Sequence, residues 1–316
     1  KKVAAFTYEA ASNQWTKGMF PLPDCVYDRC LNLDRAGRKR YVQTIRQFKK
    51  EGVYLLARCL PGKWEMYRIL SANSELAEYI PKTRLYRHPK DIFLWLKRYG
   101  ELILKPDRGW QGKGVIHIRK FPGNTFQVRG RNLRNQPFSR EFSRPDSLLQ
   151  WLGPLLGKRK YIIQSFLDLT SREGNVFDIR SFMQKQSNGC WTLLGLAVRR
   201  GGEESLTANL HGGATPENLD DFLLSQYGSN EAFHYKEQLI ELSRKIPPLI
   251  EQVHGKLFEI GIDFGIDKKG DIWILEINSK PGRIVLATCM GSRIERISLM
   301  HPVNYARHLL DWKLGG

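Results

Sequence analysis

Residues 261–278, Gly-Ile-Asp-Phe-Gly-Ile-Asp-Lys-Lys-Gly-Asp-Ile-Trp-Ile-Leu-Glu-Ile-Asn, decide the fold that this sequence predicts. Two short runs rich in apolar residues, Gly261–Asp267 and Ile272–Asn278, flank the polar segment Lys268-Lys269-Gly270. β-Branched and aromatic residues are typical of strands, and a short polar connection that contains glycine is typical of a hairpin turn. The stretch therefore predicts an antiparallel β-hairpin.

Three polar side chains interrupt the apolar pattern of this hairpin. Glu276 and Asn278 lie two residues apart and point to the same face of their strand, because strand side chains alternate between the two faces. A turn centred on Lys269-Gly270 would place Asp263 opposite Glu276. Three hard oxygen donors on one face suit Mg²⁺, with Mn²⁺ as the alternative ion. The other interpretation is that these are surface groups on an edge hairpin.

A glycine-rich loop lies upstream, at Asp107–Gly114. The apolar run Glu101–Lys105 predicts a buried strand that delivers Lys105 into this loop. Glycines let backbone N–H groups approach an anion closely, and a lysine adds a mobile charge. The spacing satisfies neither the Gly-x-x-x-x-Gly-Lys-Ser/Thr motif nor the Gly-x-Gly-x-x-Gly motif. A phosphate site and a plain tight turn therefore both stay open at this point.

The composition excludes several classes of protein. The 316 residues are 41% hydrophobic and 26% charged, which is typical of a soluble globular chain, and the length predicts two or three domains. No apolar run approaches the roughly 20 residues that cross a bilayer. The five cysteines show no Cys-x-x-Cys spacing, which indicates reduced thiols and a cytoplasmic protein. Asp263-Phe264-Gly265 resembles a kinase triplet, but no His-Arg-Asp loop precedes it.

The net charge of +18 predicts an anionic partner. Such a charge attracts phosphates, nucleic acid, anionic lipid or an acidic protein without selecting among them. No RRM, KH or helix-turn-helix pattern is present, so nucleic acid is the disfavoured partner.

Periodicity and turn residues predict a mixed α+β chain. Helices are expected at Asp34–Lys50, between Pro89 and Gly100, at Ser147–Leu156 with an interruption at Pro154, from Thr215-Pro216 toward Gly228, and from Glu231 to Ile260 with a break at Pro247-Pro248. Further strands are expected at Val115–Arg119, Thr125–Arg129, Tyr161–Phe166, Val176–Lys185 and Trp191–Arg199, the last two around the turn pair Asn188-Gly189.

Taken in order, several motifs resemble those of the ATP-grasp superfamily. They are Leu104-Lys-Pro-Asp-Arg-Gly-Trp-Gln-Gly-Lys-Gly-Val115, Tyr161-Ile-Ile-Gln-Ser-Phe-Leu167, Phe177-Asp-Ile-Arg180, Arg199, Asn209-Leu-His-Gly-Gly213 and Leu275-Glu-Ile-Asn-Ser-Lys-Pro-Gly282. The Asp-Ile-Arg, Asn…Gly-Gly and Glu-x-Asn-x-x-Pro-Gly series is similar to RimK-type glutamate ligases. More closely, Phe20-Pro-Leu-Pro-Asp24, Tyr27-Asp-Arg29 and Ile277-Asn-Ser-Lys-Pro-Gly-Arg283 resemble the YheC/YheD family of spore-forming bacteria, which carries a spore-coat-associated label.

The resemblance implies an ATP-grasp fold of the α/β class, mixed α+β, in which two α+β subdomains clamp ATP and a smaller N-terminal domain precedes them. Residues 1–80 would form the N-terminal substrate domain. Residues 81–165 would form the small subdomain with the phosphate loop, and residues 166–316 the large subdomain with the metal site.

The resemblance also implies roles for individual residues. ATP would be bound by Lys82, Lys105, Gly109, Gly112, Lys113, Gly114, Gln164, Ser165, Phe166, Leu167 and Asp178. Arg199, Asn209 and Arg180 would be catalytic residues near the transferred phosphate, and Asp263, Glu276 and Asn278 would hold Mg²⁺ or Mn²⁺. Two positions depart from the RimK-type pattern: Ser165 stands where Glu is usual, and Thr207 stands where Arg is usual.

The implied function is ATP-dependent, Mg²⁺-requiring ligation of a carboxylate to an amine, or to a thiol, through an acylphosphate, in the mother-cell cytoplasm during sporulation. The alternative is a non-catalytic, ATP-binding structural or interaction protein associated with the spore coat. Five arginines gather after the phosphate loop, which predicts an acidic peptide, protein or envelope polymer as substrate. They are Arg129, Arg131, Arg134, Arg140 and Arg144. The other interpretation is that they only offset the charge of ATP or keep the protein soluble.

Overall fold

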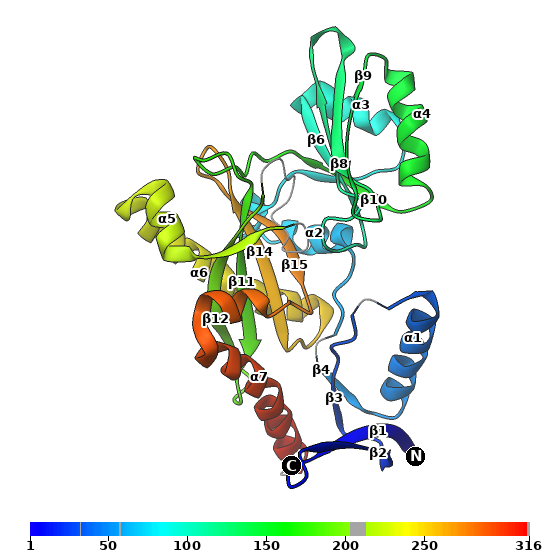
Figure 1. The fold of residues 1–316 in the computed structure, drawn as a ribbon, viewed down its shortest axis with the longest axis vertical. Coiled ribbons are helices and arrows are strands. Elements are labelled where there is room, and N and C mark those ends of the chain that lie inside the picture. The colour runs from blue at the N-terminus through cyan, green and yellow to red at the C-terminus, as the bar shows by residue number, and fades with distance from the viewer. Residues whose placement is uncertain (32, 57, 203–212, 315–316) are drawn as a thin grey trace.

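The computed structural model describes residues 1–31, 33–56, 58–202 and 213–314. Within these ranges, two larger antiparallel sheets form the body of the molecule, and an N-terminal group of strands and helices lies beside them (Figure 1). The predicted mixed α/β class is therefore confirmed. No helix in the described ranges is both long and apolar enough to cross a membrane.

The smaller unit, at the top of Figure 1, is an antiparallel sheet covered by two helices. In spatial order its strands are β5 (Thr83–Leu85), β10 (Tyr161–Ser165), β6 (Glu101–Pro106), β7 (Ile116–Lys120), β8 (Phe126–Arg131) and β9 (Pro137–Phe142). The helices are α3 (Lys90–Tyr99) and α4 (Pro145–Leu156). Leu102 and Leu104 of β6 are buried and pack with Ile92 and Leu152 of the helices. The alternation along β6 leaves Lys105 on the opposite face of its strand from this core.

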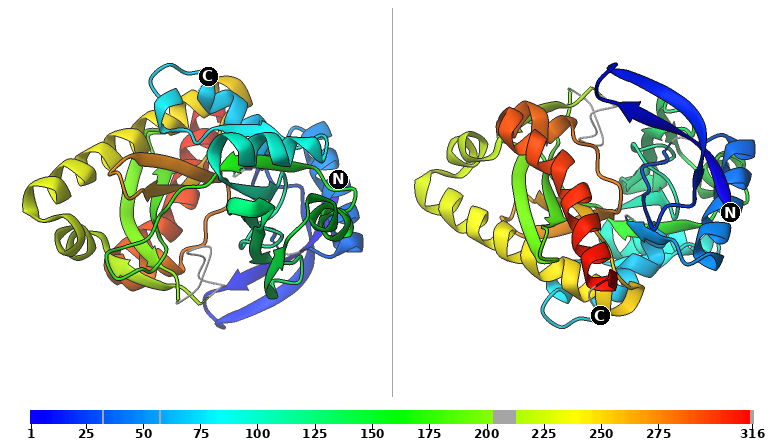
Figure 2. Two further views of the ribbon diagram at one scale, coloured as in Figure 1. Left: turned by 90° about the horizontal axis from the view of Figure 1, so that it is seen from above. Right: turned by 90° about the horizontal axis from the view of Figure 1, so that it is seen from below.

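The larger unit is a second antiparallel sheet. In spatial order its strands are β13 (Thr215–Asn218), β12 (Trp191–Arg200), β11 (Phe177–Lys185), β14 (Glu259–Ile266) and β15 (Ile272–Asn278). Helices α5 (Leu219–Tyr227) and α6 (Ser229–His254) cover one face, and α7 (Ile284–Leu314) crosses the other, as both views in Figure 2 show. Backbone torsions at Gly291 divide α7 into two helical segments.

Three of the predicted helices differ from the structure in where they begin, break or end. Thr215–Asn218 is an edge strand, because it pairs with β12, and the helix begins only after Asn218, whose side chain caps it. Helix α6 is not broken at Pro247-Pro248, since Ile246 and Pro247 are buried against the sheet and this packing outweighs the local cost of proline. It ends at His254, and the residues from Glu259 onward join strand β14 instead.

Helix α4 likewise continues through Pro154 without the predicted interruption.

The N-terminal part contains a hairpin, a short parallel pair and two helices. The hairpin consists of β1 (Lys2–Glu9) and β2 (Gln14–Pro21), and the parallel pair of β3 (Cys25–Tyr27) and β4 (Tyr54–Leu56). Helix α1 (Arg35–Lys50) begins as predicted, with the Asp34 side chain accepting from the backbone of Gly37. Helix α2 (Lys63–Ser71) packs its Met66 and Leu70 into the core of the larger sheet. Two short 3₁₀ helices are also present: η1 (Ala77–Tyr79) follows α2, and η2 (Pro122–Asn124) connects β7 to β8.

Candidate functional site

Strand register brings the charged residues of the larger sheet together. Asp178 lies opposite Arg199 on β11 and β12, and Arg180 lies opposite Asp263 on β11 and β14. Asp263 lies opposite Glu276 on β14 and β15, so the predicted pairing of these two carboxylates is confirmed. A register shift after Asp263 interrupts the ladder directly beside this pair. Charged side chains from four strands therefore gather at one end of the sheet.

Asp263 is held by two guanidinium groups. Arg180 donates from Nε and from Nη2, the latter at 3.0 Å from Oδ2 of Asp263. Nη2 of Arg199 lies 3.1 Å from the same oxygen. Arg199 also makes a two-pronged contact with Asp178, at 2.5 and 2.7 Å. The amide of Asn278 donates to Asp263 at 3.3 Å. The result is a largely buried network in which positive and negative side chains alternate.

Burial and the neighbouring arginines shift the pKa values of these carboxyl groups in opposite directions. Burial by itself would raise the pKa of Asp263, but Arg180 and Arg199 outweigh it and hold the pKa at about 2. For Asp178 burial prevails over the opposing charge of Arg199, which is shared with Asp263, and repulsion from the Asp263 carboxylate adds to the effect of burial, so the pKa of Asp178 rises to about 6. Asp263 is therefore the permanently ionised member of the pair.

A cleft lies between the larger sheet and the loop of the smaller one, with two lysines inside it. Lys105, at the end of β6, donates from Nζ to Oε1 of Gln164 at 2.6 Å. Lys63, the first residue of α2, donates to Oε1 of Glu276 at 2.8 Å and to the carbonyl of Gly109 at 3.1 Å. Burial lowers the pKa of Lys105 to about 8, although Glu276 nearby pulls it upward.

The glycine-rich loop forms the second wall of the cleft. Gly114 has φ of +74°, and a Cβ there would lie 2.9 Å from Cγ of Pro106 and from Oη of Tyr161, so only glycine fits without strain. Lys113 extends over the ring of Trp110, with Nζ 5.8 Å from the ring centroid. The loop thus presents a cation and close backbone at the mouth of the cleft.

The predicted adenine segment lies on β10 and just after it. Gln164 links Lys105 to Thr83, to which its amide donates at 2.9 Å. Ser165 donates its backbone N–H to the carbonyl of Lys82, and the ring of Phe166 stacks on His117 at 4.3 Å. The side chain of Lys82 is exposed, and Lys82 is not among the residues that line the cleft.

The cleft collects many of the predicted residues and adds others. Its lining includes the predicted residues Lys105, Gly109, Gly112, Lys113, Asp178, Asp263 and Glu276. Arg180, Arg199 and Asn278 contact Asp263 from within the larger sheet. Asn209 lies outside the described residues. Sequence reasoning missed Lys63, which also lines the cleft, and it gave no individual role to Trp110 and Leu275, which line it as well.

The chemistry of the donor set decides whether Mg²⁺ fits. Within the described ranges, no three His, Cys, Asp or Glu side chains form a metal-binding group, and the predicted trio contains only two carboxylates besides the amide of Asn278. Both carboxylates lie opposite each other on adjacent strands. Carboxylate and amide oxygens are donors of the kind that Mg²⁺ takes, and water and phosphate oxygens would have to supply the remaining ligands. The ion would have to exchange with the basic side chains that pair with Asp263 and Glu276.

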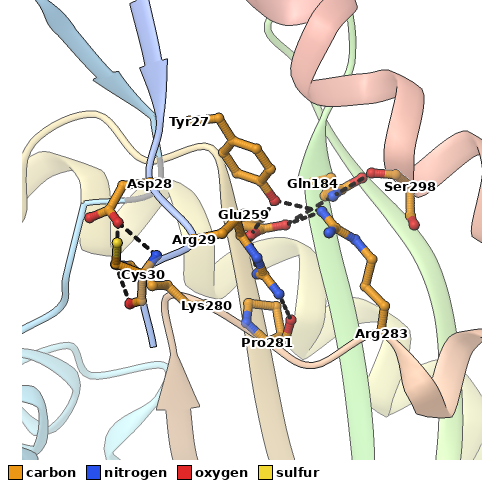
Figure 3. Close-up of polar contacts among 10 residues, drawn as sticks. All are labelled: Tyr27, Asp28, Arg29, Cys30, Gln184, Glu259, Lys280, Pro281, Arg283 and Ser298. Atoms are coloured by element: carbon orange, nitrogen blue, oxygen red, sulfur yellow. Dashed lines mark hydrogen bonds and ion pairs between the residues drawn. The ribbon is translucent and has the colours of Figure 1, made fainter. Parts of the chain in front are cut away.

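The segment after β15 is fixed to the N-terminal part by a buried carboxylate (Figure 3). Glu259 at the start of β14 is fully buried, and its Oε1 accepts from Tyr27 and Arg29, both at 2.7 Å. Its Oε2 accepts from Gln184 at 3.0 Å and from Arg283 at 3.2 Å. Two strands of the sheet, the N-terminal strand β3 and the segment 279–283 therefore meet at one carboxylate.

A second ion pair repeats this connection. Lys280 lies 2.7 Å from Asp28, with both side chains almost fully buried, and also donates to the carbonyl of Cys30. Arg29 donates to the carbonyl of Pro281 at 3.0 Å. Because segment 279–283 directly follows Asn278, these contacts also fix the end of the strand that carries Glu276.

A lysine and a glycine-rich loop on one antiparallel sheet, facing paired carboxylates and arginines on another, define an ATP-grasp fold. The solved structure described as "ATP-grasp ligase PsnB complexed with minimal precursor" has the same fold, with a TM-score of 0.50 and 13% identity over 96% of this chain and 86% of that one. Residues 52–309 match the family described as YheC/D like ATP-grasp. The chain belongs to this family.

Two curated relatives come from Bacillus subtilis (strain 168). "Endospore coat-associated protein YheC" is 31% identical over 89% of this chain and 77% of its own length. "Endospore coat-associated protein YheD" is 25% identical over 95% of this chain and 66% of its own length. The resemblance inferred from the sequence is therefore confirmed at the level of the family. Members of the ATP-grasp superfamily bind ATP and are generally ATP-dependent ligases.

Proposed function

We propose that the protein is an ATP-dependent, Mg²⁺-requiring ligase that joins a carboxylate to an amine, or to a thiol, through an acylphosphate. The observation that carries this proposal is the charge of the cleft. Four cations, Lys63, Lys105, Arg180 and Arg199, face three carboxylates, Asp178, Asp263 and Glu276. An excess of positive charge next to a glycine-rich loop suits a polyanionic ligand such as a nucleoside triphosphate.

The position of each residue in the cleft suggests its role in the proposed reaction. Lys105 and the loop Gly109–Gly114 would bind and orient the phosphates, and the segment Gln164–Leu167 would receive the adenine. Arg199 and Arg180 would stabilise negative charge that develops on the transferred phosphoryl group. Asp263, Glu276 and Asn278 would hold Mg²⁺, which supplies charge neutralisation at the phosphates when bound. No side-chain nucleophile is needed, because the substrate carboxylate attacks the phosphorus itself.

The decisive experiment is ADP release by purified protein. The protein is incubated with ATP, Mg²⁺ and candidate pairs of acids and amines, including glutamate-rich peptides. Release that requires both partners of one pair supports the ligase. ATP binding with no turnover for any pair would contradict the catalytic part of the proposal.

One observation favours a second candidate, a non-catalytic ATP-binding protein. Both predicted carboxylate ligands are already paired with basic side chains of the chain itself, Asp263 with Arg180 and Arg199, and Glu276 with Lys63. Such pairs would stabilise a site that binds nucleotide without metal. The names of the two curated relatives support an association with the spore coat for either candidate. In that case the protein would act in the mother-cell cytoplasm or at the coat.

The acceptor of the ligase is proposed to be acidic. Arg134 and Arg144 are exposed on the β8–β9 side of the smaller unit. Arg140 lies over the ring of Trp151 and contributes to packing as well as to charge. An acidic peptide, protein tail or envelope polymer would be attracted to this surface.

A further inference from the structure

Lys63 connects the two walls of the cleft, and no motif in the sequence marks it. Its Nζ donates to Oε1 of Glu276 on the larger sheet and to the carbonyl of Gly109 in the glycine-rich loop. The lysine side chain is 19% exposed and that of Glu276 is 31% exposed. The ammonium group therefore lies between the loop expected to bind phosphate and the carboxylate expected to bind metal.

The backbone around Lys63 fixes this position. The N–H of Lys63 donates to the carbonyl of Asp107 at 2.9 Å, and the N–H of Trp64 donates to Oδ1 of the same residue at 2.9 Å. At Gly62 an added Cβ would lie 2.5 Å from the Asp107 carboxylate, so the helix start and the loop touch closely. Helix α2 itself is packed in the core of the larger sheet. The lysine is thus held by both units at once.

Charge makes this arrangement sensitive to a ligand. Lys63 lies close enough to Lys105 to push the pKa of that lysine downward. Two neighbouring ammonium groups repel each other unless anions lie between them. Glu276 now supplies the negative charge, and phosphate oxygens could replace it. A divalent cation at Glu276 would in turn repel Lys63.

Resting on the proposed function, we propose that Lys63 is an internal counter-ion that exchanges partners when the cleft is loaded. In the nucleotide-free protein its ammonium group neutralises Glu276 and competes with a divalent cation. When a nucleoside triphosphate and the cation bind, Glu276 interacts with the cation, and the ammonium group of Lys63 pairs with the phosphates. One residue thereby makes metal binding depend on nucleotide binding.

The test compares Lys63→Met with wild type and with Lys245→Met. Lys245 is a matched control, because it pairs with Glu75 at 3.0 Å on the surface outside the cleft. Mn²⁺ binding is followed by electron paramagnetic resonance without nucleotide, and binding of metal-free ATP is followed by calorimetry. For Lys63→Met we expect Mn²⁺ affinity to rise and ATP affinity to fall, each by about tenfold or more, since one contact of about 1.4 kcal/mol has that effect.

These opposite changes distinguish an exchange from mere damage to the site, which would weaken both ligands. Mn²⁺ affinity equal in Lys63→Met and wild type, including no binding by either protein, would overturn the inference. So would an increase of the same size in Lys245→Met. Lys63→Arg keeps the charge and should stay close to wild type in Mn²⁺ affinity. If wild type binds no nucleotide at all, the proposed function itself fails, and that result does not depend on any variant.

Discussion

At the scale of single residues, Lys105 should make nucleotide binding depend on pH. Burial lowers its pKa to about 8, so the ammonium form is lost as the pH rises through that value. We expect the affinity of wild type for ADP to fall above pH 8, by up to about tenfold per pH unit. Calorimetric titrations between pH 7 and pH 9.5 measure this. Lys105→Arg keeps its charge over this range, and a wild-type profile as flat as that of the arginine variant would contradict the assignment.

The ionisation of Lys105 should also make the stability of the nucleotide-free protein depend on pH, and this stability should rise with pH where the affinity for ADP falls. An unfolded lysine keeps its proton up to about pH 10.4, whereas the folded one loses it near pH 8. Between these values the unfolded state binds more protons, so this residue raises the stability as the pH increases. Below pH 8 its buried charge is a constant cost.

Glu276→Gln separates catalysis from folding at a second residue. Glu276 pairs with Lys63 at 2.8 Å, and because both side chains are partly exposed the pair contributes less than about 1 kcal/mol to stability. We expect the free energy of unfolding to change by no more than that, while Mg²⁺-dependent turnover collapses. Glu75→Gln removes a comparable lysine–glutamate pair and should leave turnover intact. A strongly destabilised Glu276→Gln protein would indicate a structural carboxylate instead.

At the scale of elements, the β8–β9 region should capture the acceptor by charge. Reversing Arg134 and Arg144 to Glu should raise KM for an acidic acceptor and leave KM for ATP nearly unchanged. The effect should be large at 0.01 M salt and small at 0.15 M, since the Debye length falls from about 30 Å to about 8 Å. Steady-state kinetics at both salt concentrations test this. Reversal of the exposed Arg293 and Arg296 on α7 supplies a control with the same change in net charge.

Elements with a local signal could be predicted from the sequence, and those set by distant packing could not. The hairpin β14–β15 could be predicted from its local turn signal, but the pairing of Asp263 with Glu276 also depends on the register shift between Asp263 and Phe264, which no local signal marks. The continuity of helix α6 through Pro247 could not be predicted, because the burial that stabilises it there comes from residues of the sheet. Lys63 could not be found either, since it is 213 residues away from Glu276 in the sequence.

At the scale of the whole molecule, Glu259 should contribute strongly to the free energy of unfolding. Glu259→Gln leaves the partly buried guanidinium groups of Arg29 and Arg283 without the charge of their fully buried counter-ion. Removing one partner of a buried ion pair costs roughly 3–5 kcal/mol, and we expect a loss of this order in chemical unfolding. Glu65→Gln, which removes an exposed pair with Arg68, should cost less than about 0.5 kcal/mol. Equal losses in the two variants would show that the Glu259 cluster does not hold the parts together.

The position of Glu259 in the sequence also delays the formation of its contacts with β3 while the chain is being synthesised. Tyr27 and Glu259 are 232 residues apart, so β3 leaves the ribosome long before its anchor exists. At roughly 5–20 residues per second, the interval is about 10–50 s. During that time the early strand has neither Glu259 nor segment 279–283 to hold it. The contacts of the N-terminal part with Glu259 and segment 279–283 therefore form only after residue 283 has been made, and slower translation lengthens the interval before they form.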